Sequence, residues 1–226
     1  MNEPLFITNR NVIRKNTVIR NEKVELNNEI FVNFATFIKA LYKKEAISYP
    51  KFYKMDNLSK LGFLGAEMLL KDTAFLDRYR NEEIGIVIMN SSSSLDTDLA
   101  YYETIKDKSN YFPSPSVFVY TLPNILIGEI CIRHKIKGEN AFLVSDQFDP
   151  GKVIESVKLL LDKDHAQACL CGWVEVLGES FESVLFLVEK EKTIKEYSPA
   201  GRYSPFTIES LTQFYKTSNK PHGRAD

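Results

Sequence analysis

The chain has 226 residues, of which 44% are hydrophobic and 26% charged, a composition typical of a soluble globular protein with its own core. Basic and acidic residues nearly balance at a formal net charge of −1, which argues against a nucleic-acid binder because such proteins usually carry a basic excess. No apolar run is long enough for membrane insertion, no secretion signal opens the chain and three cysteines do not suit a disulfide framework, so we expect a cytoplasmic protein.

The first third of the chain predicts strands followed by helices. Phe6–Thr8 and Val12–Val18 have the composition of short strands. Apolar residues at helical spacing predict one helix over Phe34–Leu41 and another around Leu61–Met68, for which Ser59 is a candidate N-cap. Two small residues inside the second helix would permit close packing against another backbone: Gly62 and Gly65.

The middle of the chain predicts a buried strand and a turn. Glu83–Met89 is a compact β-branched run, which is typical of a strand buried on both faces. It ends in the serine run Ser91–Ser94, and a helix follows from Leu95. Further along, we expect a strand at Val117–Tyr120 and an apolar helix over Asn124–Arg133.

The last third continues the alternation. It predicts a short strand at 142–144, an amphipathic helix over Val153–Leu161, two neighbouring strands at Ala166–Val176 and Val184–Val188, and a last helix at Ile208–Tyr215. Strands that alternate with helices indicate an α/β protein with a mixed sheet flanked by helices. We expect a single domain over 1–226, with a flexible polar tail at 217–226.

Polar motifs that could carry chemistry have a structural interpretation that we favour. Ser91–Ser94 stands at a strand-to-helix turn, where an anion could bind, but it has neither the glycines nor the lysine of a phosphate-binding loop. Cys131 and His134 are three residues apart on a predicted helix and could form a nucleophile with its base. Because Cys131 lies in an apolar run, a packing role is the simpler interpretation.

No spacing predicts a metal site or a cofactor. Cys169 and Cys171 project to the same face of a strand and His165 precedes them, but a closed zinc site needs four ligands. His222 lies in the polar tail and is a poor catalytic candidate. Acid pairs at turns are explained by helix capping and solvation: Asp146 with Asp149, and Asp162 with Asp164.

Several segments, in order, resemble the N-terminal half of the β-ketoacyl synthases in the thiolase-like superfamily. Glu83–Ile88 is similar to the family's "R-I-G-V-V-I" strand. Val153–Leu161 and then Ala166–Glu175 match its pattern of a helix followed by "A-D-x-x-[IV]-A-G-G-x-E". The helix over 58–67 resembles the one that precedes the central strand, and Phe118–Glu129 resembles a strand, the elbow "T-A-C-S/T" and the buried helix behind it. The resemblance covers 58–188 and implies a thiolase-like layered mixed sheet, as one half of the duplicated fold.

The departures from the family pattern imply an inactive protein. The family's elbow cysteine accepts the acyl chain, and alignment on Thr121 puts Pro123 at that position. Proline offers neither a nucleophile nor a backbone N–H, and a one-residue shift brings in Asn124, which is no acyl acceptor either. The family's catalytic histidines belong to the second half, which the resemblance does not reach. We therefore expect a degenerate elbow over Thr121–Asn124 and no catalytic residue.

The resemblance implies a subunit in a type II fatty-acid or polyketide system, similar to a chain length factor. The implied partner is a full-length ketosynthase, or a second copy, with an acyl carrier protein as a further partner. The family pairs through the elbow strand and the helix behind it; here those positions are Val117, Phe118, Val119, Tyr120, Ile127 and Ile130. Tyr111 and Phe112 would help to wall the partner's acyl tunnel. Two alternatives stay open: a stand-alone module that binds an acyl chain or carrier protein, and a cysteine-dependent enzyme of unrelated chemistry.

Overall fold

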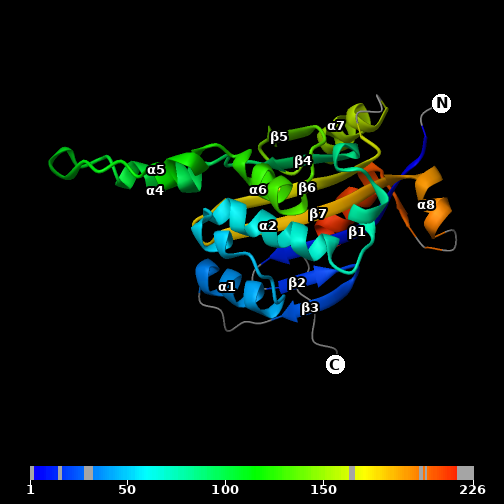
Figure 1. Ribbon diagram of the computed structural model, residues 1–226, viewed down its shortest axis with the longest axis horizontal. Helices are drawn as coiled ribbons and strands as arrows, with labels where there is room; N and C mark the ends of the chain where they lie inside the picture. Colours follow the sequence, from blue (N-terminus) through cyan, green and yellow to red (C-terminus); the bar gives the residue numbers. More distant parts are fainter. Residues whose placement is uncertain are drawn as a thin grey trace.

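The computed structural model describes residues 3–14, 17–27, 33–162, 166–198, 201 and 203–217. Its strands are β1 (Leu5–Arg14), β2 (Thr17–Arg20), β3 (Lys23–Asn27), β4 (Ile84–Asn90), β5 (Asn140–Val144), β6 (Ala168–Leu177), β7 (Ser180–Lys190) and β8 (Ser204–Pro205). They form one mixed sheet in the order β3-β2-β1-β7-β6-β4-β5, with β8 paired to β1 (Figure 1).

The helices are α1 (Phe34–Lys44), α2 (Asn57–Leu70), α3 (Phe75–Arg78), α4 (Leu95–Glu103), α5 (Pro115–Phe118), α6 (Ile125–His134), α7 (Pro150–Asp162), α8 (Glu191–Tyr197) and α9 (Ile208–Thr217). Short 3-10 turns join them: η1 (Pro50–Lys54), η2 (Asn81–Glu83), η3 (Lys108–Asn110) and η4 (Val119–Thr121). A mixed sheet with helices on its faces confirms the predicted α/β class.

Strand direction divides the sheet into two regions. β4 is parallel to both β5 and β6, so the carboxyl ends of these three strands meet at one edge of the sheet. β7 is antiparallel to both β6 and β1. β6 and β7 are therefore neighbours, as predicted for Ala166–Val176 and Val184–Val188. Their close pairing requires glycine at Gly172, whose φ is +145° and where a Cβ would lie 2.1 Å from the Val184 carbonyl oxygen.

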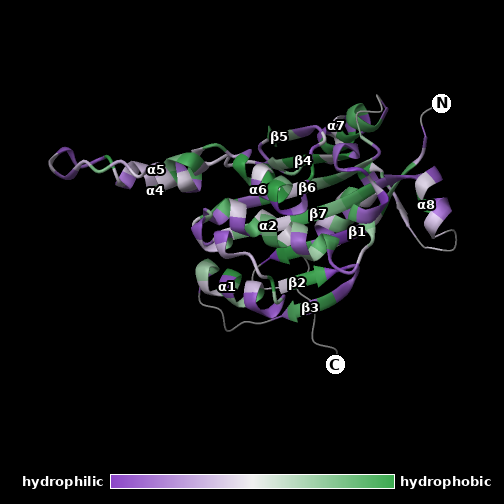
Figure 2. Ribbon diagram, viewed as in Figure 1, coloured by the Kyte–Doolittle hydropathy of each residue, from purple (hydrophilic) through white to green (hydrophobic). Residues whose placement is uncertain are grey.

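The sheet has an apolar core on each face. One core packs α1, α2 and α6 against the sheet, and the other packs α7 and α9, drawn in red behind it, against the opposite face. Figure 2 shows the apolar character of the strands between these layers. A Cβ on Gly62 would lie 2.0 Å from Leu126 Cδ1 of α6, and one on Gly65 would lie 2.8 Å from Leu185 Cδ1 of β7. Neighbouring elements thus pack closely on α2 at both glycines, but the atoms that approach belong to side chains and not, as predicted, to another backbone.

The strand predicted at Val117–Tyr120 is wrong, because these residues form α5 and η4. Ser114 caps this helical segment by accepting a hydrogen bond from the Val117 N–H, and Pro115 occupies its first turn. The β-branched valines suggested a strand, but no described strand lies beside them. Local capping therefore decides the conformation.

Other boundaries differ from the predictions near the N-terminus. Phe6–Thr8 belongs to the continuous strand β1, and the hairpin of β2 and β3 and the short helix α8 were not predicted. Ser59 does not cap α2; Asp56 does, by accepting a hydrogen bond from the Ser59 N–H at 3.0 Å. Residues 15–16 of the strand predicted at Val12–Val18, and 218–226 of the predicted tail, lie outside the described residues.

The segment that contains α4 and α5 projects from the body as an arm (Figure 1). At its base, the Tyr120 hydroxyl donates to the buried Glu129 at 3.0 Å, and Ser94 Oγ donates to the Thr121 carbonyl at 2.8 Å. Within the described ranges, no single helix is long and apolar enough to cross a membrane; 115–121 and 125–134 pass that test only as a pair bent by 98°.

Candidate functional site

The edge of the sheet where β4, β5 and β6 end is a candidate ligand site, because ligands of open α/β sheets bind outside the carboxyl ends of parallel strands. Two turns meet there: the serine turn Ser91–Ser94 after β4, and the turn 145–149 between β5 and α7. The Ser145 N–H donates to the Asn90 carbonyl at 2.9 Å, which joins the two turns.

The serine turn is filled by a carboxylate of the chain itself. Glu175 of β6 accepts from the N–H of Ser91 at 2.6 Å, from its hydroxyl at 2.6 Å, and from the N–H of Ser92 at 3.2 Å. These are the donors that an anion would need. The structure thus favours the tight-turn interpretation of Ser91–Ser94 over phosphate binding.

The turn between β5 and α7 places an amide where a strand passes into a helix. Gln147 is exposed, Phe148 is buried, and Asp149 caps α7 by accepting from the Lys152 N–H at 3.1 Å. Lys152 Nζ lies 3.1 Å from Ser145 Oγ. No residue of 145–149 is a cysteine or a histidine. The turn can bind by hydrogen bonds, but it holds no thiol for acyl transfer.

The predicted elbow residues occupy a different connection. Thr121 is the last residue of η4, and its carbonyl accepts a hydrogen bond from Ser94 of the serine turn. The connection from η4 to α6 consists of Leu122, Pro123 and Asn124. Because a helical turn and not a strand precedes them, they do not form a strand-to-helix elbow.

The three cysteines are free thiols in packed positions. Cys169 and Cys171 are fully buried in β6, and burial raises the pKa of both thiols. Burial also raises the pKa of Cys131 on α6. A nucleophilic cysteine needs the opposite shift, since the thiolate is the reactive form. The packing interpretation of these cysteines is therefore favoured.

His134 has a different partner from the one considered for it. Its Nε2 lies 3.1 Å from Glu67 Oε1, and Arg133 Nε lies 2.7 Å from the same oxygen. Burial alone would raise the pKa of Glu67, but the contacts with His134 and Arg133 lower it overall. His134 thus belongs to a polar cluster with Glu67 of α2 and Arg133 of α6.

The described part of the chain contains no group of three or more potential metal ligands. Asp149 caps α7. His165, Asp164 and His222 lie outside the described residues.

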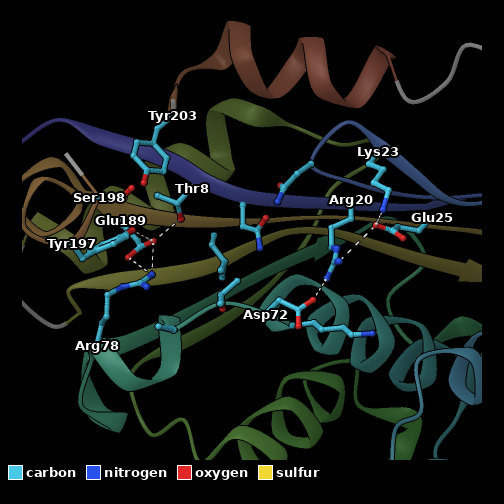
Figure 3. A pocket seen from close by; sticks show the side chains of 16 residues that line it. Thr8, Arg20, Lys23, Glu25, Asp72, Arg78, Glu189, Tyr197, Ser198 and Tyr203 are labelled. Atoms are coloured by element: carbon cyan, nitrogen blue, oxygen red, sulfur yellow. Dashed lines mark hydrogen bonds and ion pairs between the residues drawn. The ribbon is translucent and has the colours of Figure 1, made fainter. Parts of the chain in front are cut away.

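A second concave region lies at the opposite end of the strands, near the start of β6. Its cavity of about 640 Å³ is lined by Thr8, Asn9, Arg20, Asn21, Lys23, Glu25, Lys71, Asp72, Thr73, Ala74, Arg78, Leu187, Glu189, Tyr197, Ser198 and Tyr203 (Figure 3). Glu189 pairs with Ala168, the first residue of β6, which places this cavity far along the strands from the carboxyl edge.

The Glu189 carboxylate is fully buried, and four side chains donate hydrogen bonds to it. Thr8 Oγ1 donates at 2.6 Å, Tyr197 at 2.9 Å, and Arg78 NH2 lies 3.1 Å and 3.2 Å from the two oxygens (Figure 3). The Tyr79 hydroxyl also donates, at 2.7 Å. Burial and the nearby Glu189 charge raise the pKa of both tyrosines. A carboxylate with all of these partners is a structural anchor.

The cavity rim is also neutralised by its own ion pairs. Arg20 lies 3.3 Å from Asp72, and Lys71 lies 2.8 Å from Glu45. The sequence analysis missed this cluster. Its signal is a single acidic residue at the end of the apolar run Val184–Val188, which is costly to bury unless it is paired.

The predicted interface residues divide by exposure. Ile127 and Ile130 are buried at 1% and 0% exposure, and Tyr120 is also buried, so none of the three is available to a partner. This corrects the expectation for them: α6 turns these isoleucines into the core beneath α2. Phe118 and Val119 are exposed on the arm, as are Tyr111 and Phe112, and Val117 is half-buried.

No protein-family model matches the sequence, and no curated protein matches it. Solved structures are similar in fold. The ishigamide ketosynthase/chain length factor has a TM-score of 0.58 and 16% identity over 89% of this chain and 64% of its own. A type II polyketide acyl-carrier protein in complex with its ketosynthase bound to the hexaketide gives 0.60 and 15% over 88% and 66%. A ketosynthase in complex with its chain length factor from Xenorhabdus doucetiae gives 0.54 and 12% over 83% and 79%.

The chain therefore spans just under two thirds of the first two of these structures. Identities of this size show the fold alone. The mixed sheet, its helices on both faces and these similarities together show that the chain has the thiolase-like fold of the ketosynthases and chain length factors.

Proposed function

We propose that this chain is a non-catalytic ketosynthase-like subunit of a type II fatty-acid or polyketide system, which pairs with an active ketosynthase. The observation that carries the proposal is the absence of a thiol from the turn between β5 and α7. All three cysteines lie elsewhere, on α6 and β6.

That turn fits the family's elbow better than Thr121–Asn124 does. The family pattern is a strand, a sharp turn, a buried helix and the strand "A-G-G-x-E", and β5, the turn 145–149, α7 and β6 follow that order. Asp149 already occupies the N-terminus of α7, where a thiolate would gain from the helix dipole. Gln147 can accept or donate hydrogen bonds, but its amide cannot carry an acyl chain.

The partner surface follows from the sheet. β5 is an edge strand of the sheet, because it pairs with β4 on one side and none of the described strands pairs with its other side. An open edge strand offers unpaired backbone groups to another chain. Val144, 57% exposed at the end of β5, adds apolar surface there. We place the pairing strand at β5 and not at Val117–Tyr120.

The arm adds a second apolar surface. Its exposed large side chains are Leu95, Leu99, Tyr102, Tyr111, Phe112, Phe118, Val119 and Leu122. A set of this size on one projecting segment indicates a protein contact. The ketosynthase and chain length factor complexes with similar folds make a ketosynthase the favoured partner, with Tyr111 and Phe112 at its acyl tunnel and an acyl carrier protein as a transient partner.

Co-expression with a neighbouring ketosynthase tests the proposal. We expect a stable complex on size exclusion, weakened at least about tenfold by Val144→Lys, which puts a charge on the pairing edge. The matched control is Leu159→Lys on α7, where the native side chain is 55% exposed on another element. Absence of a complex, with carrier-protein binding by the isolated chain, would instead support the binding-module alternative.

A further inference from the structure

Three aromatic rings from distant parts of the sequence meet beside the turn 145–149. Phe148 of the turn packs against Trp173 of β6, with ring centroids 6.2 Å apart in a T-shaped arrangement. On the other side, Tyr215 of α9 stacks on Phe148 at 4.7 Å and 30°. The C-terminal helix thus places a side chain directly on the turn that we assign as the elbow.

Polar contacts hold Tyr215 in this position. Its hydroxyl donates to Glu182 at 2.7 Å, and Arg14 bonds both Glu182, at 2.6 Å, and the Tyr215 carbonyl, at 2.9 Å. The Arg14 guanidinium also lies 4.5 Å from the Tyr215 ring centroid. These contacts join α9 to the end of β1, at Arg14, and to the start of β7, at Glu182.

The indole of Trp173 indicates that the space beneath Tyr215 is closed. Trp173 is only 3% exposed, and its Nε1 is buried without a hydrogen-bond partner among the described residues. Apolar side chains surround the rings, including Val184 and Phe186.

We propose that α9 is a built-in cover of the elbow, in which Tyr215 fills the apolar space that an acyl chain would otherwise enter. The inference rests on the proposed function and deepens it. Because Tyr215 of this protein fills the site, no acyl group binds at this elbow. The growing acyl chain therefore lies in the ketosynthase partner. Displacement of Tyr215 exposes an aromatic site formed by Phe148 and Trp173 that fits a saturated acyl chain.

The chain contains a single tryptophan, so the fluorescence of Trp173 reports directly on this space. The probe is dodecanoic acid brominated at its terminal carbon, because bromine quenches an indole only at close contact. We expect no saturable quenching of the wild type and saturable quenching of Tyr215→Ala. The matched control, Tyr215→Phe, keeps the ring and loses only the hydroxyl, and should behave as the wild type.

Thermal denaturation establishes that each variant is folded, and Tyr215→Val replaces Tyr215→Ala if the latter does not fold. Saturable quenching of the wild type would overturn the inference, as would a folded, ring-deleted variant that the probe does not quench. Pairing with the ketosynthase is measured separately. An unquenched wild type that forms no complex would leave the cover intact and refute the subunit role alone.

Discussion

Substitution of the buried Glu189 tests whether its carboxylate is a structural anchor of the cavity that it lines near the start of β6. Glu189→Ala removes the partner of Arg78 and the acceptor of three hydroxyl groups, on Thr8, Tyr79 and Tyr197. Breaking a buried ion pair costs about 3–5 kcal/mol. Because the Arg78 side chain keeps 19% of its exposure and can recruit water, we expect the lower end, about 3 kcal/mol.

A loss of that size lowers the melting temperature by roughly 6–12 °C for a chain of this length. Thermal denaturation followed by circular dichroism measures it. Glu191→Ala is the matched control, because among the described residues the Glu191 side chain pairs with Lys195 at the surface, at 2.8 Å, a contact worth about 0.3–0.5 kcal/mol. If Glu189→Ala melts within the range of this control, the carboxylate is not an anchor, and a functional role for the cavity has to be reconsidered.

Two further predictions concern packing and pH. Gly62→Ala should destabilise the protein, because the new Cβ forces Leu126 to move at a cost of about 1–3 kcal/mol, which about 1 kcal/mol of helix propensity offsets only in part. Gly128→Ala should stabilise it, because nothing lies within 4 Å of the new Cβ. Urea unfolding measures the free energy of unfolding of both variants, and equal changes would contradict the packing at Gly62. The free energy of unfolding should fall as the pH rises above about 10, because Tyr79 and Tyr197 ionise there in the unfolded chain while their raised pKa keeps them neutral in the fold. Thermal scans across that range check this, and Tyr197→Phe should weaken the dependence.

Local patterns in the sequence were enough to predict much of the fold. The β-branched run of β4 predicted a strand buried on both faces, and all seven of its residues are buried. The apolar spacing of α7 predicted an amphipathic helix, and the same apolar residues, from Val153 to Leu161, face the core. These elements follow from side-chain periodicity, which requires no knowledge of distant partners.

The errors arose where the pattern was ambiguous or the partner was distant. Val117 and Val119 favoured a strand, whereas Ser114 and Pro115 already carried the signal of a helix start. That error placed the expected elbow at Pro123, whereas we propose the turn after β5 as the elbow. The Glu189 cluster was not predictable by spacing, because its donors lie as far away in sequence as Thr8.

The most direct test of the account is the reactivity of the three thiols in the native chain. Cerulenin and iodoacetamide are added in turn, and the intact mass is followed with time, with urea-unfolded protein as the positive control. We expect Cys169 and Cys171 to stay unmodified and Cys131 to react slowly, and all three to react once the chain is unfolded. Rapid stoichiometric labelling of one native cysteine would contradict the claim that the chain has no catalytic nucleophile.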